Sequence, residues 1–132
     1  MPPHACRVLV IEDEAFILLM IEEALSGADC NAILATRGED ALVLAHQHRP
    51  DLVVMDLRLG RGTVGPDFLT QLREAVPSPL PVVIASGFRL SEDERHEYDL
   101  AGGGPPVSLL QKPYAPEDLV TAVLAGLRKV GA

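Results

Sequence analysis

Short apolar runs alternate with amphipathic stretches along almost the whole chain. The apolar runs are rich in Val, Ile and Leu and are bounded by turn-forming residues, which is typical of strands buried on both faces. In the stretches between them, apolar positions return at helical spacing. The pattern predicts strands over residues 7–11, 30–35, 52–56, 82–85 and 107–110, and helices over residues 14–26, 39–47, 67–75 and 116–129. Residues 91–100 are charged and weakly patterned, and they fit either a short helix or a loop.

The regular alternation of strand and helix indicates the fold class. Strands separated by helices imply a parallel sheet with helices on both faces, because such crossovers are right-handed. We therefore predict an α/β fold, a flavodoxin-like (βα)5 doubly wound sheet with strand order 2-1-3-4-5. A length of 132 residues with 48% hydrophobic content suits a single domain, with a core of about residues 7–128 and no output domain.

Four of the predicted strands end in polar residues. Glu12 and Asp13 follow the first strand, Asp56 ends the third, Ser86 follows the fourth and Lys112 follows the fifth. In doubly wound sheets, ligands bind outside the carboxyl ends of the strands, so these side chains should meet. Three clustered carboxylates favour a cation among them, and oxygen ligands suit Mg²⁺. Beside Mg²⁺, a lysine and a hydroxyl, Asp56 is suited to act as a nucleophile that forms an aspartyl-phosphate.

Each of these residues also has an ordinary structural alternative when it is taken alone. Asp56 could form a turn or cap a helix, and residues 12–14 could be acids favoured by the dipole of the first helix. Lys112 alone would be a surface lysine and Ser86 alone a turn residue. Their occurrence at successive strand ends is what favours a site.

Four motifs carry a resemblance to a known family. VLVIEDE contains Glu12 and Asp13, DLVVMDLRLG contains Asp56, VVIASG contains Ser86, and LLQKP contains Lys112. With these motifs the chain resembles the receiver domain of bacterial two-component response regulators, over about residues 7–127. The resemblance implies that Asp56 takes a phosphoryl group from a phosphohistidine.

The resemblance also implies a set of metal ligands. Mg²⁺, or another divalent cation such as Mn²⁺, would be bound by Asp13, Asp56 and the backbone carbonyl of Arg58. Glu12 would act on the metal directly or through water. Glu12 is one methylene longer than the Asp that the family commonly has there.

Further implied roles concern the phosphoryl group and the switch. Ser86 and Lys112 would contact the phosphoryl oxygens, and the Lys112–Pro113 peptide bond would be cis. The family usually has an aromatic switch residue three positions before the lysine, where this chain has Leu109. We therefore predict that Phe88 takes the place of that aromatic and pairs with Ser86 in the switch. The loop of residues 59–66 also departs from the family's usual Met-Pro-Gly turn.

The first predicted helix has an apolar surface that fits two interpretations. Its first two turns are apolar nearly all round, so the helix is either wedged into the core or offers a docking face to a partner helix. The expected phosphoryl donor is a sensor histidine kinase or a histidine phosphotransfer protein. A downstream protein partner would receive the signal. The sequence is compatible with either a monomer or a homodimer.

Charge and composition limit the possible partners and the cellular location of the protein. A net charge of −8 argues against nucleic-acid binding, and the longest apolar run, residues 15–21, is too short to span a membrane. Cys6 and Cys30 do not form a disulfide framework, and residues 1–7 lack the features of a signal peptide. We therefore expect a cytoplasmic protein with reduced thiols.

Three other functions remain as alternatives. A receiver excised from a hybrid histidine kinase would carry the same residues. A Mg²⁺-dependent phosphatase of the haloacid-dehalogenase group would need a second acid two residues after the nucleophile, where this chain has Arg58. A pseudo-receiver that is never phosphorylated is disfavoured by the intact Asp56 and Lys112. We predict a signalling switch and not an enzyme, with only self-directed phosphotransfer and slow autodephosphorylation.

Overall fold

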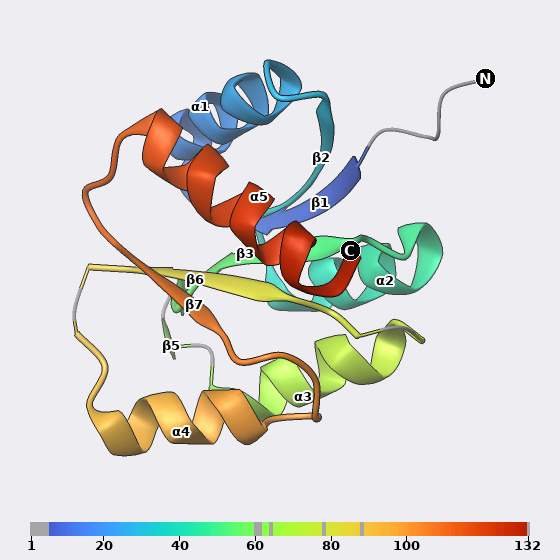
Figure 1. Ribbon diagram of the computed structural model, residues 1–132, viewed down its shortest axis with the longest axis vertical. Helices are drawn as coiled ribbons and strands as arrows, with labels where there is room; N and C mark the ends of the chain where they lie inside the picture. The colour runs from blue at the N-terminus through green and yellow to red at the C-terminus, as the bar shows by residue number, and fades with distance from the viewer. Residues whose placement is uncertain (1–5, 60–61, 64, 78, 88, 132) are drawn as a thin grey trace.

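Five parallel strands form the central sheet of the protein (Figure 1). The computed structural model describes residues 6–131 except 60–61, 64, 78 and 88. The strands of the sheet are β1 (Cys6–Ile11), β2 (Cys30–Ala35), β3 (Leu52–Asp56), β6 (Val82–Ser86) and β7 (Ser108–Gln111). The helices are α1 (Ala15–Ser26), α2 (Gly38–His48), α3 (Pro66–Ala75), α4 (Glu92–Leu100) and α5 (Pro116–Gly131). The strands lie in the order β2-β1-β3-β6-β7, which confirms the predicted fold class and strand order.

Helices cover both faces of the sheet and divide the core into two layers. On one face, apolar side chains of α2 and α3 pack against the sheet, and on the other face those of α1 and α5 do so. All five residues of β3 are buried. Val53 and Met55 pack into the first layer, whereas Leu52 and Val54 pack into the second, because successive side chains of a strand point to opposite faces. This two-sided burial explains why the strand is apolar up to its last residue, Asp56.

A small ribbon follows β3 where the sequence predicts only a loop. Residues Arg58–Leu59 (β4) pair antiparallel with Gly62–Thr63 (β5). Two-residue strands are too short to leave a periodic pattern in the sequence. The four described residues of this ribbon are therefore a feature that the sequence pattern does not predict.

The segment that fits either a helix or a loop is the helix α4. Its start is fixed by a capping box, in which the Ser91 hydroxyl accepts a hydrogen bond from the Glu94 backbone N–H at 3.1 Å. The Ser91 backbone N–H in turn donates to Glu94 Oε1 at 2.9 Å. This Ser-x-x-Glu pattern is a sequence signal for the start of a helix at this position.

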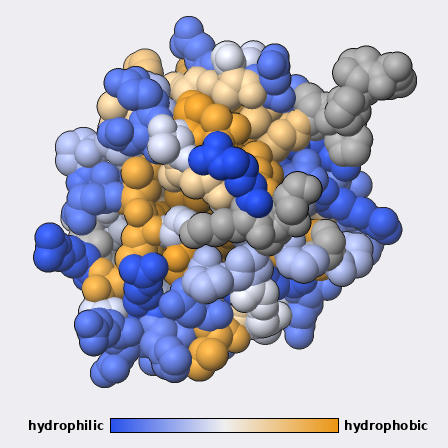
Figure 2. Space-filling model, in the orientation of Figure 1, coloured by the Kyte–Doolittle hydropathy of each residue, from blue (hydrophilic) through white to orange (hydrophobic). Residues whose placement is uncertain are grey.

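One side of α1 packs into the core, as the first interpretation predicts, while the docking role of its exposed apolar side stays a prediction. Leu18, Ile21 and Leu25 are buried in the core, whereas Phe16 and Leu19 are 88% and 58% exposed. Apolar residues also reach the surface around α5 and β7, among hydrophilic side chains (Figure 2). Within the described residues, no helix has the length and apolar character that a membrane span requires.

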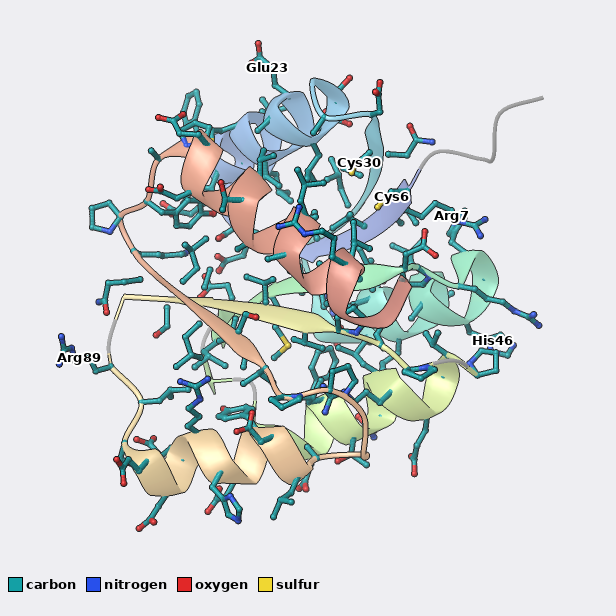
Figure 3. All side chains as sticks on the ribbon, in the orientation of Figure 1. Cys6, Arg7, Glu23, Cys30, His46 and Arg89 are labelled. Atoms are coloured by element: carbon teal, nitrogen blue, oxygen red, sulfur yellow. The ribbon has the colours of Figure 1, made fainter. Side chains whose placement is uncertain are left out.

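The two cysteines lie opposite each other on neighbouring strands. Cys6 of β1 is the register partner of Cys30 of β2, and both are free thiols (Figure 3). Burial raises the pKa of Cys6 to about 12, with Cys30 and Asp51 adding to the effect. Because the thiolate is the reactive form, this thiol is poorly reactive at neutral pH.

Candidate functional site

The parallel register brings the predicted site residues to one edge of the sheet. Glu12 directly follows β1, and its backbone N–H donates to the Ala35 carbonyl at 3.0 Å, which continues the β1–β2 ladder. Asp56 ends β3 and is the register partner of Ala85, the residue before Ser86. Lys112 follows β7, and its backbone N–H donates to the Ser86 carbonyl at 2.8 Å. Strand ends that are far apart in sequence thus meet at the carboxyl edge.

A bridge formed by Lys112 is the centre of this arrangement. Its Nζ lies 3.0 Å from Glu12 Oε1 and 3.0 Å from Asp56 Oδ2. The Glu12 and Asp56 side chains are only 3% and 8% exposed, while that of Lys112 is 21% exposed. Charge-assisted hydrogen bonds of this kind compensate buried carboxylates that would otherwise be costly.

The electrostatics of the bridge affect its two sides differently. Burial raises the pKa of Glu12 above its ordinary value of 4.5, and the hydrogen bonds from Lys112 and from the Glu14 backbone only partly oppose this. Burial lowers the pKa of Lys112, but its hydrogen bonds to Asp56 and Glu12 outweigh burial, so the pKa lies above its ordinary 10.5. The ammonium group therefore stays charged at neutral pH, while ionised Glu12 remains incompletely compensated.

Three carboxylates at this edge could hold a metal ion. One oxygen each from Glu12, Asp13 and Asp56 lies within 4.8 Å of the others, and Asp13 is the exposed member of the cluster. When all three are ionised, they carry more negative charge than the single positive charge of the bridging Lys112. A hard divalent cation with oxygen ligands fits both this donor set and this charge.

The structure describes most, but not all, of the other residues that the sequence predicts for the site. Ser86 is buried at the end of β6, and the Lys112–Pro113 peptide bond is cis. Arg58 begins β4, two residues after Asp56, and the role of its carbonyl as a metal ligand stays a prediction. Phe88 lies outside the described residues, so its predicted role as the switch aromatic is also untested.

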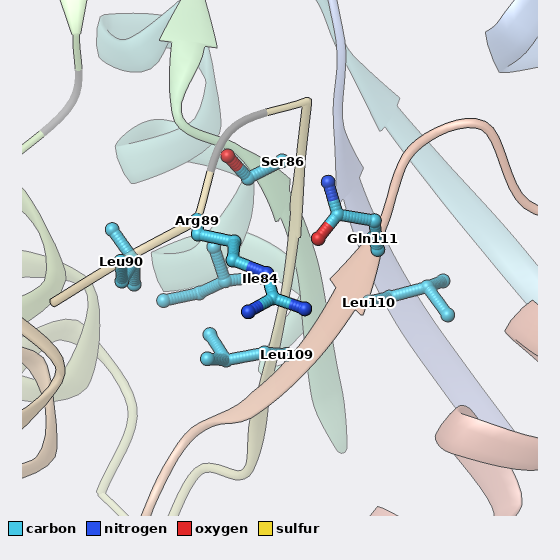
Figure 4. A pocket seen from close by; sticks show the side chains of 7 residues that line it. All are labelled: Ile84, Ser86, Arg89, Leu90, Leu109, Leu110 and Gln111. Atoms are coloured by element: carbon cyan, nitrogen blue, oxygen red, sulfur yellow. The ribbon is translucent and has the colours of Figure 1, made fainter. Parts of the chain in front are cut away.

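A cavity of about 230 Å³ adjoins the site on the β7 side. It is lined by Ile84, Ser86, Arg89, Leu90, Leu109, Leu110 and Gln111 (Figure 4). Leu109 is 40% exposed, although it is a large apolar side chain in a sheet strand. The surface next to Ser86 therefore has a hollow that is lined in part by exposed apolar side chain.

Tyr114 is a polar residue near the site that the sequence argument missed. Its hydroxyl oxygen is buried and has no hydrogen-bond partner among the described residues. Burial raises the pKa of Tyr114; the charge of Lys112 lowers it, while those of Glu12 and Asp56 raise it. Its position two residues after Lys112 was the available signal.

Comparisons with known proteins show which family the sequence resembles. The family model described as "Response regulator receiver domain" matches residues 8–124. The chain is 36% identical over 124 residues to the "Probable transcriptional regulatory protein TcrX" of Mycobacterium tuberculosis, covering 94% of this chain and 50% of that protein. It is 30% identical over 123 residues to the "Phyllosphere-induced regulator PhyR" of Methylorubrum extorquens, covering 92% of this chain and 43% of that protein. The chain thus spans about half the length of these curated relatives.

Solved structures give the same fold. A two-component response regulator from Clostridium difficile superposes with a TM-score of 0.80 at 20% identity, covering 96% of this chain and 99% of that one. The anti-anti-sigma factor PhyR of Bartonella quintana superposes with a TM-score of 0.73 at 26% identity, covering 97% of this chain and 51% of that one.

Proposed function

The chain belongs to the response regulator receiver domain family, and we propose that it is a phosphorylation-operated switch whose phosphoacceptor is Asp56. The observation that carries this proposal is the Lys112 bridge, in which Nζ lies 3.0 Å from Asp56 Oδ2 at the carboxyl edge of the sheet. A buried carboxylate with a fixed cation beside it is a suitable nucleophile for phosphoryl transfer.

The transfer step uses groups of this chain in separate roles. A carboxylate oxygen of Asp56 attacks the phosphorus of a phosphohistidine; an O–P bond forms, the P–N bond breaks, and the histidine nitrogen keeps the bonding electron pair. Lys112 and the Ser86 hydroxyl bind the oxygens of the transferred group. Asp13, Glu12, Asp56 and the Arg58 carbonyl would hold Mg²⁺, which neutralises negative charge on the phosphoryl oxygens. Slow hydrolysis of the aspartyl-phosphate would reset the switch, so the chain would act on itself alone.

Phosphorylation would act through local charge. A phosphoryl group adds a charge of about −1.5 to −2 at an edge that already carries three carboxylates. Lys112 and Ser86 would shift toward it. They lie at the ends of β7 and β6, which line the cavity beside Leu109, and α4 is hydrogen-bonded to Val107, the residue just before β7. We infer that the signal leaves through protein contacts on this α4–β7 surface.

Partners are proposed from the surface and from the relatives. The exposed Phe16 and Leu19 of α1 begin only four residues after Glu12, so a helix of the phosphoryl donor could dock there while presenting its histidine to Asp56. The donor would be a sensor histidine kinase or a histidine phosphotransfer protein. The downstream partner would be a protein, as the name "anti-anti-sigma factor" suggests for one structural neighbour.

The test is Mg²⁺-dependent phosphorylation by acetyl phosphate, read as the intact mass of the protein. We expect one phosphoryl adduct on the wild type, none after Mg²⁺ is chelated, and none on Asp56→Asn. Asp51→Asn is the matched control, because Asp51 directly precedes β3, at the end remote from Asp56, and accepts a hydrogen bond from the Arg7 backbone N–H. Absence of the adduct from the wild type would refute the proposal, and multiple turnover of a diffusible phosphate ester would favour a phosphatase.

A further inference from the structure

A buried arginine on α3 holds the loop that joins α4 to β7. Arg73 is only 6% exposed, and its guanidinium donates three hydrogen bonds to backbone carbonyls. Nε donates to Leu80 at 3.3 Å, Nη1 to Ala101 at 2.9 Å, and Nη2 to Pro105. Two of these carbonyls belong to residues 101–107, the α4–β7 loop. A rigid planar fork with several donors is suited to such simultaneous contacts, whereas lysine is not.

The glycines of this loop allow the close approach. Gly102 has φ +71°, and a Cβ there would lie 3.0 Å from Arg73 Cβ and 3.2 Å from Thr70 Cα. Gly104 has φ +107°, and a Cβ there would lie 3.4 Å from Arg73 Nε. Both conformations are costly for other residues. The glycine-rich sequence is therefore explained by the need to wrap the loop around Arg73.

Two side chains of α4 hold the other end of the same loop. Asp99 Oδ1 accepts a hydrogen bond from the Val107 N–H at 2.9 Å, and Arg95 Nη2 donates to the Val107 carbonyl at 3.4 Å. Arg95 and Asp99 also form an ion pair at 3.9 Å. Val107 directly precedes β7, so these contacts fix α4 relative to the strand that leads to Lys112.

The helix itself contributes little apolar packing. All nine residues of α4 are described, and Tyr98 is the one that is buried. Most helices are held in place by an apolar face, which α4 lacks. Arg73, Arg95 and Asp99, here called the polar clasp, therefore supply much of what holds α4 in position.

We infer that the polar clasp sets the resting position of α4 and that Arg73 is its central positioning residue. This inference rests on the proposed function, because it names the contacts that the α4–β7 surface must rearrange when Asp56 is phosphorylated. Burial lowers the pKa of Arg73, while the charge of Asp99 opposes this. The buried cation is thus supported both by carbonyl oxygens and by the acid at the far end of the loop.

The test is residue-resolved amide hydrogen exchange, followed by NMR, on unphosphorylated Arg73→Met and Arg73→Lys. Because hydrogen bonds to charged groups are stronger than neutral ones, we expect exchange about tenfold faster in α4 and at Val107, with β1 and β3 unchanged. Asp99→Ala should have the same pattern, and Glu97→Ala, an exposed acid on the same helix, should not. If Arg73→Met does not fold, Asp99→Ala against Glu97→Ala decides the question.

The same proteins are then treated with acetyl phosphate and Mg²⁺. We expect wild-type stoichiometry of the adduct on Asp56 in every variant, but a smaller change in α4 exchange on phosphorylation when Arg73 is replaced. Exchange in α4 equal to that of the wild type, or equal loosening of β1, β3 and α4, would overturn the inference. Absence of the adduct from the wild type would instead refute the proposed function. Hydrogen exchange of the unphosphorylated proteins would still test whether the polar clasp holds α4.

Discussion

The β1–β3 side and the α4–β7 side of the sheet edge are held by different interactions. On the first side, every residue of β3 is buried and Val8–Ile11 of β1 are at most 1% exposed, so apolar packing fixes the backbone that presents Glu12 and Asp56. On the second side, α4 buries only Tyr98, Leu109 is 40% exposed, and a cavity adjoins Ser86. There, the hydrogen bonds of the polar clasp hold α4 in position.

This difference separates two tasks within a small domain. A phosphoacceptor and its ligands need fixed geometry, which a close-packed core provides. A surface that changes with phosphorylation needs contacts that can break at low cost, and regions with few buried apolar contacts open first. The two sides meet at Lys112, which follows β7 but bonds to both acids of the fixed side.

The largest expected effect is on the packed side. Leu9→Ala removes a fully buried side chain of β1 and should lower the free energy of unfolding by about 2–5 kcal/mol, because it leaves a cavity. Leu100→Ala removes the same atoms from a 65% exposed position of α4 and should change it by no more than about 0.5 kcal/mol. Urea unfolding measures both. Equal losses would mean that the two sides are packed alike.

A ligand on the packed side should stabilise the whole domain. Mg²⁺ at 100 times its dissociation constant should raise the free energy of unfolding by about 2.7 kcal/mol. Asp13→Asn removes the exposed carboxylate of the cluster and should require more Mg²⁺ for the same gain. Asp40→Asn, an exposed acid at the start of α2, is the control and should respond like the wild type. An unchanged response of Asp13→Asn would remove Asp13 from the ligand set.

The smallest effect concerns the one buried side chain of α4. The pKa of Tyr98 is raised above its ordinary 10.0, first by burial and then by Glu94 and Glu97. Because the folded state holds the phenol proton more tightly, this contribution to stability is complete below pH 10 and is lost as the pH rises through the raised pKa. Tyr98→Phe should therefore have a shallower decline of stability above pH 10 than the wild type, measured by urea unfolding. An identical decline would show that Tyr98 does not titrate with folding.

The sequence predicted the packed side better than the loosely packed side. Strands such as β3 are apolar up to their ends because both faces are covered, so their pattern alone predicts them. The strand order follows from the alternation of strands and helices. The residues at the strand ends then meet because of the register. The sequence predicts that Lys112 lies near Glu12 and Asp56. It does not predict that Lys112 bonds to both acids at the same distance.

The polar clasp could not be predicted in the same way. Arg73 looks like an ordinary charged residue of an amphipathic helix, and nothing local indicates that it is buried against carbonyls of Ala101 and Pro105. Three successive glycines beginning at Gly102 are typical of a loop, but Arg73, which Gly102 and Gly104 approach, is almost thirty residues earlier in the chain. Long-range polar contacts leave no periodic signal, whereas apolar burial does.

The most direct test of the account compares hydrogen exchange of the wild type with and without the phosphoryl group on Asp56, by mass spectrometry of peptides, with the adduct quantified in the same samples. We expect changed exchange in α4, the α4–β7 loop and β7, and unchanged exchange in β1 and β3. Changes that are equal on both sides, or no change in α4 when the adduct is present, would contradict the division between a fixed site and a responsive surface.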